Sequence, residues 1–400
     1  MTTASDTAAR PLLPILVALS FAHLLNDVIQ SMIPAMYPLF KDSYALSFAQ
    51  IGLITLAFQV TSSLLQPVFG FVTDHRPWPY AMVLGMGATL TGLLSMAFAT
   101  TYPVILIAAA CVGLGSAVFH PEATRMARHA AAGQQGFAQG IFQIGGHAGY
   151  AIGPLLAASV VMPNGQTSLS YVSVVALAAM VLMVWTGGRY AEMRREQLAT
   201  GKAGTAKGAA FPSLSAGRVV LAMTVLMVLL ASKNAYTAAF TSYYTFYLIE
   251  RFGIGVQASQ IMLFLYLVVG AFGVIAGGMV GDRIGRDRVI WISILGTLPF
   301  ALMLPYTSLF WTGVLSVLIS FILASAFSSI LIFAIDLVPH RVGLVGGLFY
   351  GLSFGLGGIA AGVLGLLADR IGIVEVFKVC AFLPAVGLLT IFLPKPERPM

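Results

Sequence analysis

Four polar residues on one face of the first apolar segment have side chains suited to proton exchange and polar binding. They occur at i, i+3, i+4 and i+7, which places them on one side of an α-helix: His23, Asn26, Asp27 and Gln30. Ionisable groups inside apolar segments are costly and usually face a cavity or a partner. We predict that Asp27 carries a proton and that the other three contact a ligand. The alternative is a stripe that only hydrogen-bonds to neighbouring helices.

A lysine is the counterpart of this stripe in the second half of the chain. Lys233 lies near the middle of an apolar segment, where its ammonium group is too deep to reach water easily. It is either the ion-pair partner of Asp27 or another acid, or the docking point of an anion, and the two roles could alternate. Tyr236 is deep enough to line the same cavity. Tyr243 is a further ligand candidate, although tyrosines near the segment end could form an interfacial aromatic belt.

The end of the fourth apolar segment holds a second ionisable group. His120 and Glu122 flank Pro121, which can bend a helix, and Arg125 follows Glu122 at i+3, where the two can pair. We predict ligand contact by His120 and proton carriage by Glu122, with Arg125 near an inner gate. A purely structural ion pair at a helix end is an equally good interpretation.

The second and fifth apolar segments add amides, an imidazole and small residues. Gln143 and His147 are one helical turn apart, and Gln59 lies in the second segment, so all three are predicted to line the cavity. They could equally serve only as hydrogen-bonding groups between helices. A cluster of small residues ends in proline and permits close packing and a bend: Gly149, Gly153 and Pro154.

The elements that position these residues are predicted from composition. The chain has 400 residues, of which 58% are hydrophobic and 9% are charged, far fewer charges than a soluble domain carries. Charges are concentrated in short stretches between apolar runs of bilayer-spanning length. We predict an all-α polytopic membrane protein with twelve spans and a first span that acts as its own insertion signal. Six helices in residues 1–187 and six in 218–400 are expected to flank a basic cytoplasmic linker at 188–217.

Charge and cysteine usage exclude several classes of function. The net charge of +7 is divided among many loops, so it does not indicate nucleic-acid binding. Basic residues number 16 on one predicted side and 4 on the other, which places both termini in the cytoplasm. The two cysteines lie inside apolar runs and indicate neither a disulfide framework nor a metal site. We expect no cofactor, no enzymatic activity and a monomer in lipid.

The two halves share a loop motif. Gly278-x-x-x-Asp282-Arg283-x-Gly285-Arg286 resembles the loop signature of the major facilitator superfamily, and a weaker copy runs from Gly70 to Asp74. The resemblance implies two six-helix halves with a substrate site between them, near the membrane midplane. A gating role is predicted for Asp282, Arg283 and Arg286 and less strongly for Asp74. Asp336 could pair with Arg341 or with the 283–288 cluster. The Gly149–Pro154 element resembles the fifth-helix motif of proton-coupled drug exporters in this superfamily.

Longer stretches resemble one branch, the fosmidomycin-resistance family. They are Ser20–Asp27, Phe119–Glu122, Ser242–Tyr247 and Phe321–Ser328. The resemblance implies an efflux pump of the bacterial inner membrane that exchanges the small anionic antibiotic fosmidomycin for protons. Lys233 is then expected to contact the phosphonate of the drug. The alternative is an uptake carrier of the same fold for a native small organic anion, because fold alone does not set direction.

Overall fold

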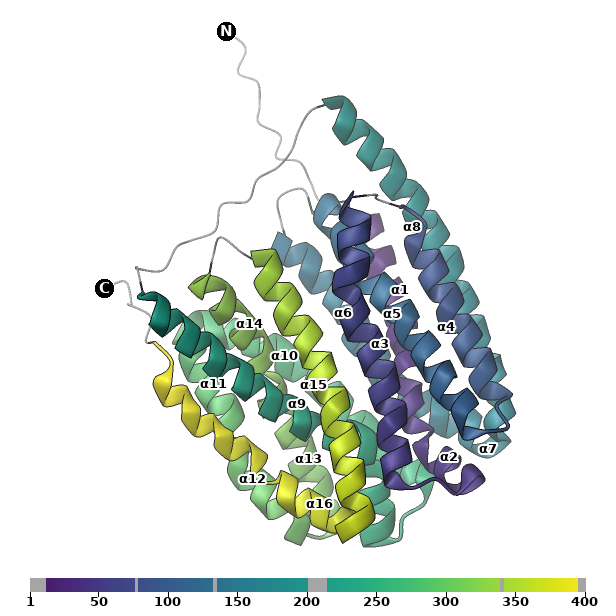
Figure 1. The fold of residues 1–400 in the computed structure, drawn as a ribbon, viewed down its shortest axis with the longest axis vertical. Coiled ribbons are helices and arrows are strands. Elements are labelled where there is room, and N and C mark those ends of the chain that lie inside the picture. Colours follow the sequence, from purple (N-terminus) through teal and green to yellow (C-terminus); the bar gives the residue numbers. More distant parts are fainter. Residues whose placement is uncertain (1–11, 76–77, 132–134, 201–213, 339–341, 395–400) are drawn as a thin grey trace.

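The computed structural model describes residues 12–75, 78–131, 135–200, 214–338 and 342–394, and in these ranges the regular structure is helical (Figure 1). The first half contains α1 (Leu13–Ala35), α2 (Tyr37–Tyr44), α3 (Phe48–His75), α4 (Ala81–Ala97), α5 (Tyr102–Ala130), α6 (Gln135–Leu156), the π-helical η1 (Ala157–Val161), α7 (Met162–Asn164), the 3-10 helix η2 (Gln166–Val172) and α8 (Ser173–Thr200).

The second half repeats this arrangement of long helices. It contains α9 (Ala216–Phe252), α10 (Val256–Ile284), α11 (Arg286–Leu295), α12 (Leu298–Met303), η3 (Leu304–Tyr306), α13 (Leu309–Ala324), α14 (Ala326–Leu337), α15 (Val342–Ile371), α16 (Ile373–Cys380) and η5 (Leu383–Phe392).

Helices are the expected solution for this sequence, because a chain in a bilayer must satisfy its backbone groups internally. Ten described segments are long and apolar enough to span a membrane, and α4 is a shorter apolar helix of 17 residues. Together with α15, they are consistent with the twelve predicted passes. The chain is therefore a multi-pass membrane protein.

Several predicted spans are interrupted, and prolines account for one break. The first span, expected as a single run, ends at Ala35; α2 follows, with Pro34 before the break and Pro38 in the first turn of α2. The tenth span divides at Ser325 between α13 and α14. The first part of the predicted linker is helical, since α8 continues to Thr200. Residues 201–213 of that linker lie outside the described ranges.

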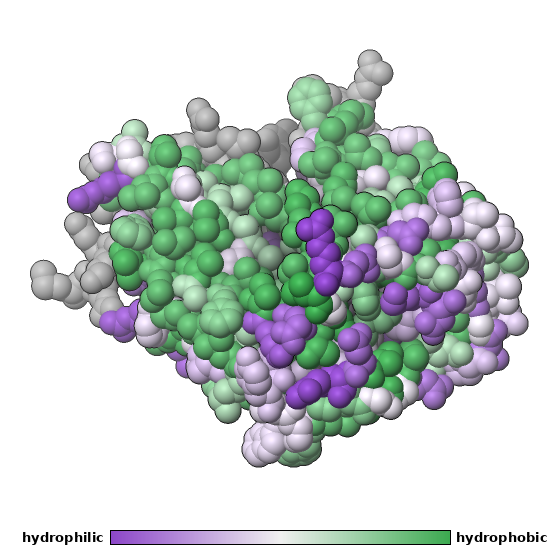
Figure 2. Space-filling view, turned by 60° about the horizontal axis from the view of Figure 1, so that its bottom comes forward, coloured by the Kyte–Doolittle hydropathy of each residue, from purple (hydrophilic) through white to green (hydrophobic). Residues whose placement is uncertain are grey.

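The long helices run between two ends of the molecule. We call the end that holds α2 and α16 the α2 end, and the opposite end, where α1 begins, the Leu13 end (Figure 1). In Figure 2 hydrophilic residues gather on the face at the α2 end, whereas the flanks are largely hydrophobic. Apolar side chains exposed on the flanks include Ile107, Val181 and Ile391, which suits contact with lipid tails.

The two halves are joined at the α2 end. Gln260 Nε2 donates to Ala35 O at 2.6 Å, and the Thr55 and Ser242 hydroxyls are hydrogen-bonded at 3.2 Å. Between described residues, the hydrogen bonds recorded across the halves all lie toward this end. The conformation is therefore closed at the α2 end.

Candidate functional site

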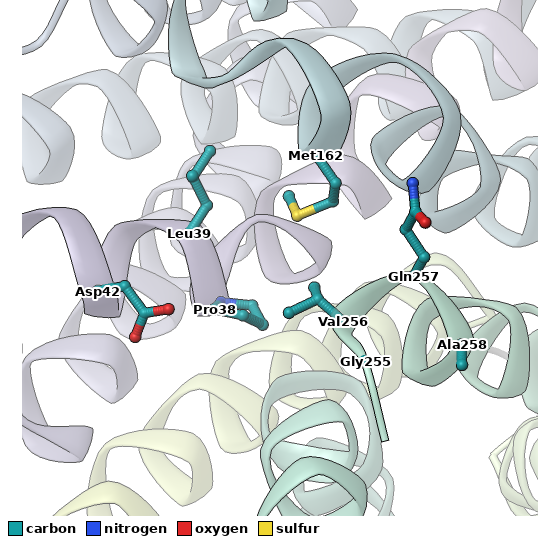
Figure 3. Close-up of a pocket in the computed structure, with 8 residues that line it drawn as sticks. All are labelled: Pro38, Leu39, Asp42, Met162, Gly255, Val256, Gln257 and Ala258. Atoms are coloured by element: carbon teal, nitrogen blue, oxygen red, sulfur yellow. The ribbon is translucent and has the colours of Figure 1, made fainter. Parts of the chain in front are cut away.

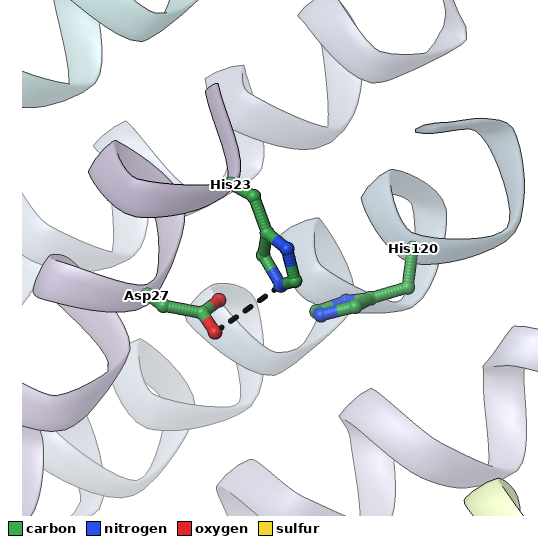
Figure 4. A group of neighbouring side chains, drawn as sticks. All are labelled: His23, Asp27 and His120. Carbon is green, nitrogen blue, oxygen red and sulfur yellow. Dashed lines mark ion pairs between the residues drawn. The ribbon is translucent and has the colours of Figure 1, made fainter. Parts of the chain in front are cut away.

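The predicted stripe on α1 forms a buried polar cluster. His23 Nε2 lies 3.3 Å from Asp27 Oδ2, one helical turn away, and the two side chains are only 5% and 13% exposed (Figure 4). The His120 imidazole approaches from α5, edge-on to His23 with ring centroids 5.1 Å apart. The i, i+4 spacing therefore brings an acid and an imidazole into contact, and tertiary packing adds the second imidazole.

The hydrogen bonds of this cluster require a proton between His23 and Asp27. His23 Nδ1 lies 2.9 Å from the carbonyl oxygen of Phe142, which can only accept, so Nδ1 carries a hydrogen. Nε2 then faces a carboxylate oxygen at 3.3 Å. Two lone pairs would repel at that distance, so the contact needs a proton on Nε2 or on Oδ2. The pair can therefore hold and release one proton within the described fold.

The position of His23 is determined by α6. Its ring stacks on Phe142 with centroids 4.1 Å apart, and Gly146 also lies close to the ring. A Cβ built on Gly146 would lie 2.3 Å from His23 Cε1, far inside van der Waals contact. Only glycine leaves room for the imidazole at this point, so the α1–α6 contact orients the proton-binding pair.

Amide and hydroxyl groups extend the cluster toward α5. Asp27 Oδ1 accepts from Asn26 Nδ2 at 2.9 Å and from Gln30 Nε2 at 3.2 Å. Gln30 Oε1 accepts from Ser116 Oγ at 3.3 Å, and Ser116 also contacts His120 Nδ1. Sequence reasoning missed Ser116, although its i, i+4 spacing from His120 on a helix could have indicated it.

One group of described side chains is close enough together to hold a metal ion, namely His23, Asp27 and His120. One ligand atom from each lies within 4.8 Å of the others. The two histidines and one carboxylate are ligand types that divalent transition metals accept. The sequence predicts no metal, and the hydrogen bonds to Asn26, Gln30 and Phe142 account for these contacts without one.

The second half contributes a cation, Lys233, to the neighbourhood of His147. The charges of Asp27, His23 and Lys233 all act on the His147 imidazole, so this residue lies within electrostatic range of both halves. Its Nε2 atom is buried and has no hydrogen-bond partner among the described residues. A cation and an imidazole nitrogen without a hydrogen-bond partner are the kinds of group that bind an anion.

Lys233 does not pair with Asp27 in this structure. Its ammonium nitrogen lies over the Phe327 ring, 5.6 Å from the centroid, whereas the Asp27 contacts are to His23, Asn26 and Gln30. The predicted Asp27–Lys233 ion pair is therefore not formed in the conformation closed at the α2 end. Lys233 is half-buried, and its ammonium group has no carboxylate partner among the described residues, so it is available for an anionic ligand.

Glu122 and Arg125 form the predicted ion pair at the end of α5. Glu122 is fully buried, and its Oε1 accepts from Arg125 Nη1 at 2.8 Å. Arg125 Nη2 also donates to the Gly70 carbonyl on α3 at 3.3 Å. The pair links α5 to the start of the first glycine-rich loop, as the structural interpretation expects. Proton carriage by Glu122 stays a prediction.

The remaining predicted ligand contacts are more dispersed. Tyr236 is buried and packs edge-on against Phe240 at 5.3 Å. The Tyr243 hydroxyl donates to Ala361 O at 2.6 Å, so it is engaged between α9 and α15. Gln59 faces Gly357 of α15, and its Oε1 is buried with no partner among described residues. Gln143 is half-buried on α6, one turn before His147.

The predicted gating residues lie toward the Leu13 end, and two of them form a pair. Arg286 Nη1 donates to Asp336 Oδ2, which joins α11 to α14, one of the pairings expected from the sequence. Arg283 is exposed. The side chains of Asp74 and Asp282 lie outside the described residues, so their predicted roles stay predictions.

The small residues of α6 pack against α1 as predicted. A Cβ on Gly149 would lie 2.2 Å from Leu24 O, and one on Gly153 would lie 1.9 Å from Ser31 Oγ. Pro154 is inside α6, shortly before the helix changes to the π-helical η1. This close contact holds the His23 side of α1 against α6.

The fold and site define a class of membrane transporter. The sequence pattern of the Major Facilitator Superfamily matches residues 19–362 and 235–400, and the chain belongs to this family. It is therefore a transporter and not an enzyme. Among solved structures, a bacterial homologue of the human lysosomal transporter Spinster, in an inward-facing and occupied conformation, has a TM-score of 0.70 at 15% identity over 95% of this chain and 94% of that one. The nucleoside transporter NupG has a TM-score of 0.70 at 13% identity over 94% and 98%.

Two curated relatives match nearly the whole chain. The fosmidomycin resistance protein of Escherichia coli (strain K12) is 51% identical over 391 residues, which cover 98% of this chain and 95% of the relative. An uncharacterized MFS-type transporter of Bacillus subtilis (strain 168) is 38% identical over 96% of this chain and 94% of its own length. The similarity to the fosmidomycin-resistance family that the sequence indicated is confirmed.

Proposed function

We propose that this protein is a proton-coupled antiporter that exports fosmidomycin or a similar small anionic phosphonate by alternating access. It works as a monomer in the bacterial inner membrane, with both termini in the cytoplasm. The 51% identity to a fosmidomycin resistance protein supports the substrate class. The excess of basic residues on one predicted side supports the orientation.

The observation that carries the proposal is the buried contact of His23 with Asp27, which can hold one proton. The pair can bind one proton and release it again, as coupling to a proton gradient requires. Lys233 and His147 supply positive charge and a free ring nitrogen for a phosphonate. Movement of the two halves would change the surroundings of the His23–Asp27 pair and of Lys233. The proton and the drug can therefore each favour a different conformation.

A second candidate is a proton-coupled uptake carrier for a small organic anion. A proton added to the His23–Asp27 pair makes this region more positive, which favours simultaneous binding of an anion. Exchange requires the opposite preference, in which the state that holds the proton binds the anion less well. Flux measured in vesicles of known orientation separates the two candidates.

The test is proton movement in proteoliposomes when fosmidomycin is added under a pH gradient. We expect fosmidomycin-evoked proton flux that falls about tenfold or more in Asp27→Asn and in Lys233→Ala, because each removes one coupled site. Glu375→Gln and Lys378→Ala are the matched controls, since this partly exposed pair lies elsewhere, on α16, and should leave flux unchanged.

Three outcomes are informative. Drug movement without proton flux would refute coupling and retain the transporter. Proton flux that runs with the drug would favour the uptake carrier. Unchanged flux in both variants would place the site away from α1 and α9.

A further inference from the structure

A four-residue sequence occurs twice in the second half, at opposite ends of the molecule. Asp-Arg-Ile-Gly ends α10 at residues 282–285 and ends α15 at residues 369–372. Both glycines have left-handed backbone torsions, with φ of 98° at Gly285 and 83° at Gly372, and each stops its helix. The first copy belongs to the loop motif of the superfamily. The second copy lies at the α2 end and has no role in the function proposed above.

The aspartate of the second copy binds the other half of the molecule. Asp369 Oδ1 accepts from the backbone N–H of Phe48 at 2.7 Å, and Oδ2 accepts from that of Ala49 at 2.8 Å. These are the first residues of α3, whose N–H groups have no acceptor within their own helix. A carboxylate at this position also interacts favourably with the positive end of the helix dipole. Asp369 therefore caps a helix of the opposite half.

The backbones of α3 and α15 approach closely around this cap. A Cβ on Gly365 would lie 2.3 Å from Phe48 O, and one on Gly52 would lie 2.6 Å from Ala361 O. The Tyr243 hydroxyl from α9 donates to the same Ala361 carbonyl. We call this contact between the two helices the α3–α15 seam. It depends on small residues, and Asp369 lies at its outermost turn. The cap can form only while α3 and α15 are in contact.

The equivalent seam, between α6–α7 and α10, has a different chemistry. Gly165 has φ of 77° and lies 207 positions before Gly372 (372 − 165). The two copies of the loop motif have nearly the same spacing, since Asp74 lies 208 positions before Asp282 (282 − 74). The residue three positions before Gly165 is Met162, in place of Asp369. It lines a pocket of about 450 Å³ together with the first turn of α10 (Figure 3). Asp42 of α2 also lines this pocket, but among the described residues the recorded hydrogen bonds from a carboxylate to a helix start of the other half are those of Asp369 to α3.

We infer that Asp369 is a gate residue that stabilises the conformation closed at the α2 end by capping α3 across the two halves. Opening this end separates α15 from α3 and exposes the N–H groups of Phe48 and Ala49 to water. Removal of the carboxylate therefore shifts the equilibrium toward the state open at the α2 end. The inference rests on alternating access and is independent of which substrate is carried.

The test measures the reactivity of single cysteines in the full-length protein after Cys111→Ser and Cys380→Ser. Ser242→Cys reports on the α2 end, because Ser242 is buried there against Thr55. Gln66→Cys reports on α3 toward the Leu13 end, where the residue is half-buried. With a membrane-impermeant thiol reagent, we expect Asp369→Ala to accelerate labelling at Ser242→Cys about fivefold and to slow it at Gln66→Cys. The labelling rates of Asp369→Asn should lie between those of the native residue and Asp369→Ala, because an amide oxygen still caps a helix.

Glu375→Gln is the matched control, since Glu375 also lies at the α2 end and, among the described residues, pairs with Lys378 of its own helix. The inference fails if Asp369→Ala leaves both rates unchanged or if Glu375→Gln has the same effect. Faster labelling at both reporters would show general loosening of the fold, and would also refute it. Because the readout needs no substrate, a failed transport assay and a failed gate assay are distinguishable.

Discussion

At the residue scale, the most constrained part of the site is the slot for the His23 ring. Phe142 supplies a stacking face and a carbonyl acceptor, and Gly146 supplies the space for the ring. The ring nitrogen that faces Asp27 is therefore determined by α6 and not by α1. Proton binding should depend on a glycine that carries no functional group.

Gly146→Ala tests this dependence. The added methyl group would overlap the imidazole, and overpacking of this kind costs about 1–3 kcal/mol or displaces the ring. We expect fosmidomycin-evoked proton flux to fall severalfold while the purified protein stays monodisperse. Gly140→Ala is the matched control on the same helix, because its Cβ would meet no described atom within 4 Å. Equal flux in the two variants would contradict the assigned role of the slot.

At the scale of elements, α11 and α14 are joined by the ion pair of Arg286 and Asp336. The side chains of Arg286 and Asp336 are 31% and 26% exposed, so the pair is partly screened and its contribution to stability is small. The pair lies beside the Asp282–Arg286 loop, where it is suited to stabilise one conformation of the second half at the Leu13 end.

Asp336→Asn is expected to lower unfolding stability by no more than about 1 kcal/mol while changing transport more than stability. A double-mutant cycle with Arg286→Gln, read out as transport rate and as melting temperature, checks this. Coupling between the two substitutions in the transport rate, but not in the melting temperature, would support a gating role. Coupling in melting alone would indicate a structural pair.

At the scale of the whole molecule, the structure is one state of a pair of states. The hydrogen bond between Thr55 and Ser242 and the Asp369 cap hold the two halves together at the α2 end. Alternating access requires these contacts to break once in each transport cycle. A covalent bond across them should therefore arrest transport.

Thr55→Cys with Ser242→Cys, after replacement of the two native cysteines, tests that requirement. The hydroxyl oxygens are 3.2 Å apart, so a disulfide is geometrically accessible. We expect oxidation to abolish substrate flux and a reductant to restore it, whereas each single cysteine variant should be insensitive to oxidant. Full transport by the oxidised pair would mean that the α2 end need not open.

The sequence alone determined the class of protein and the helical face that His23 shares with Asp27. Apolar runs of spanning length and scarce charges leave only a helical membrane fold, and the i, i+4 spacing of His23 and Asp27 places them in contact on any helix. Only tertiary structure decided which helices meet. The approach of His120, the Gly146 slot, the separation of Lys233 from Asp27 and the Asp369 cap on α3 all join residues far apart in the chain. Helical periodicity reports which residues share a face, but the partner of that face depends on close packing between whole helices.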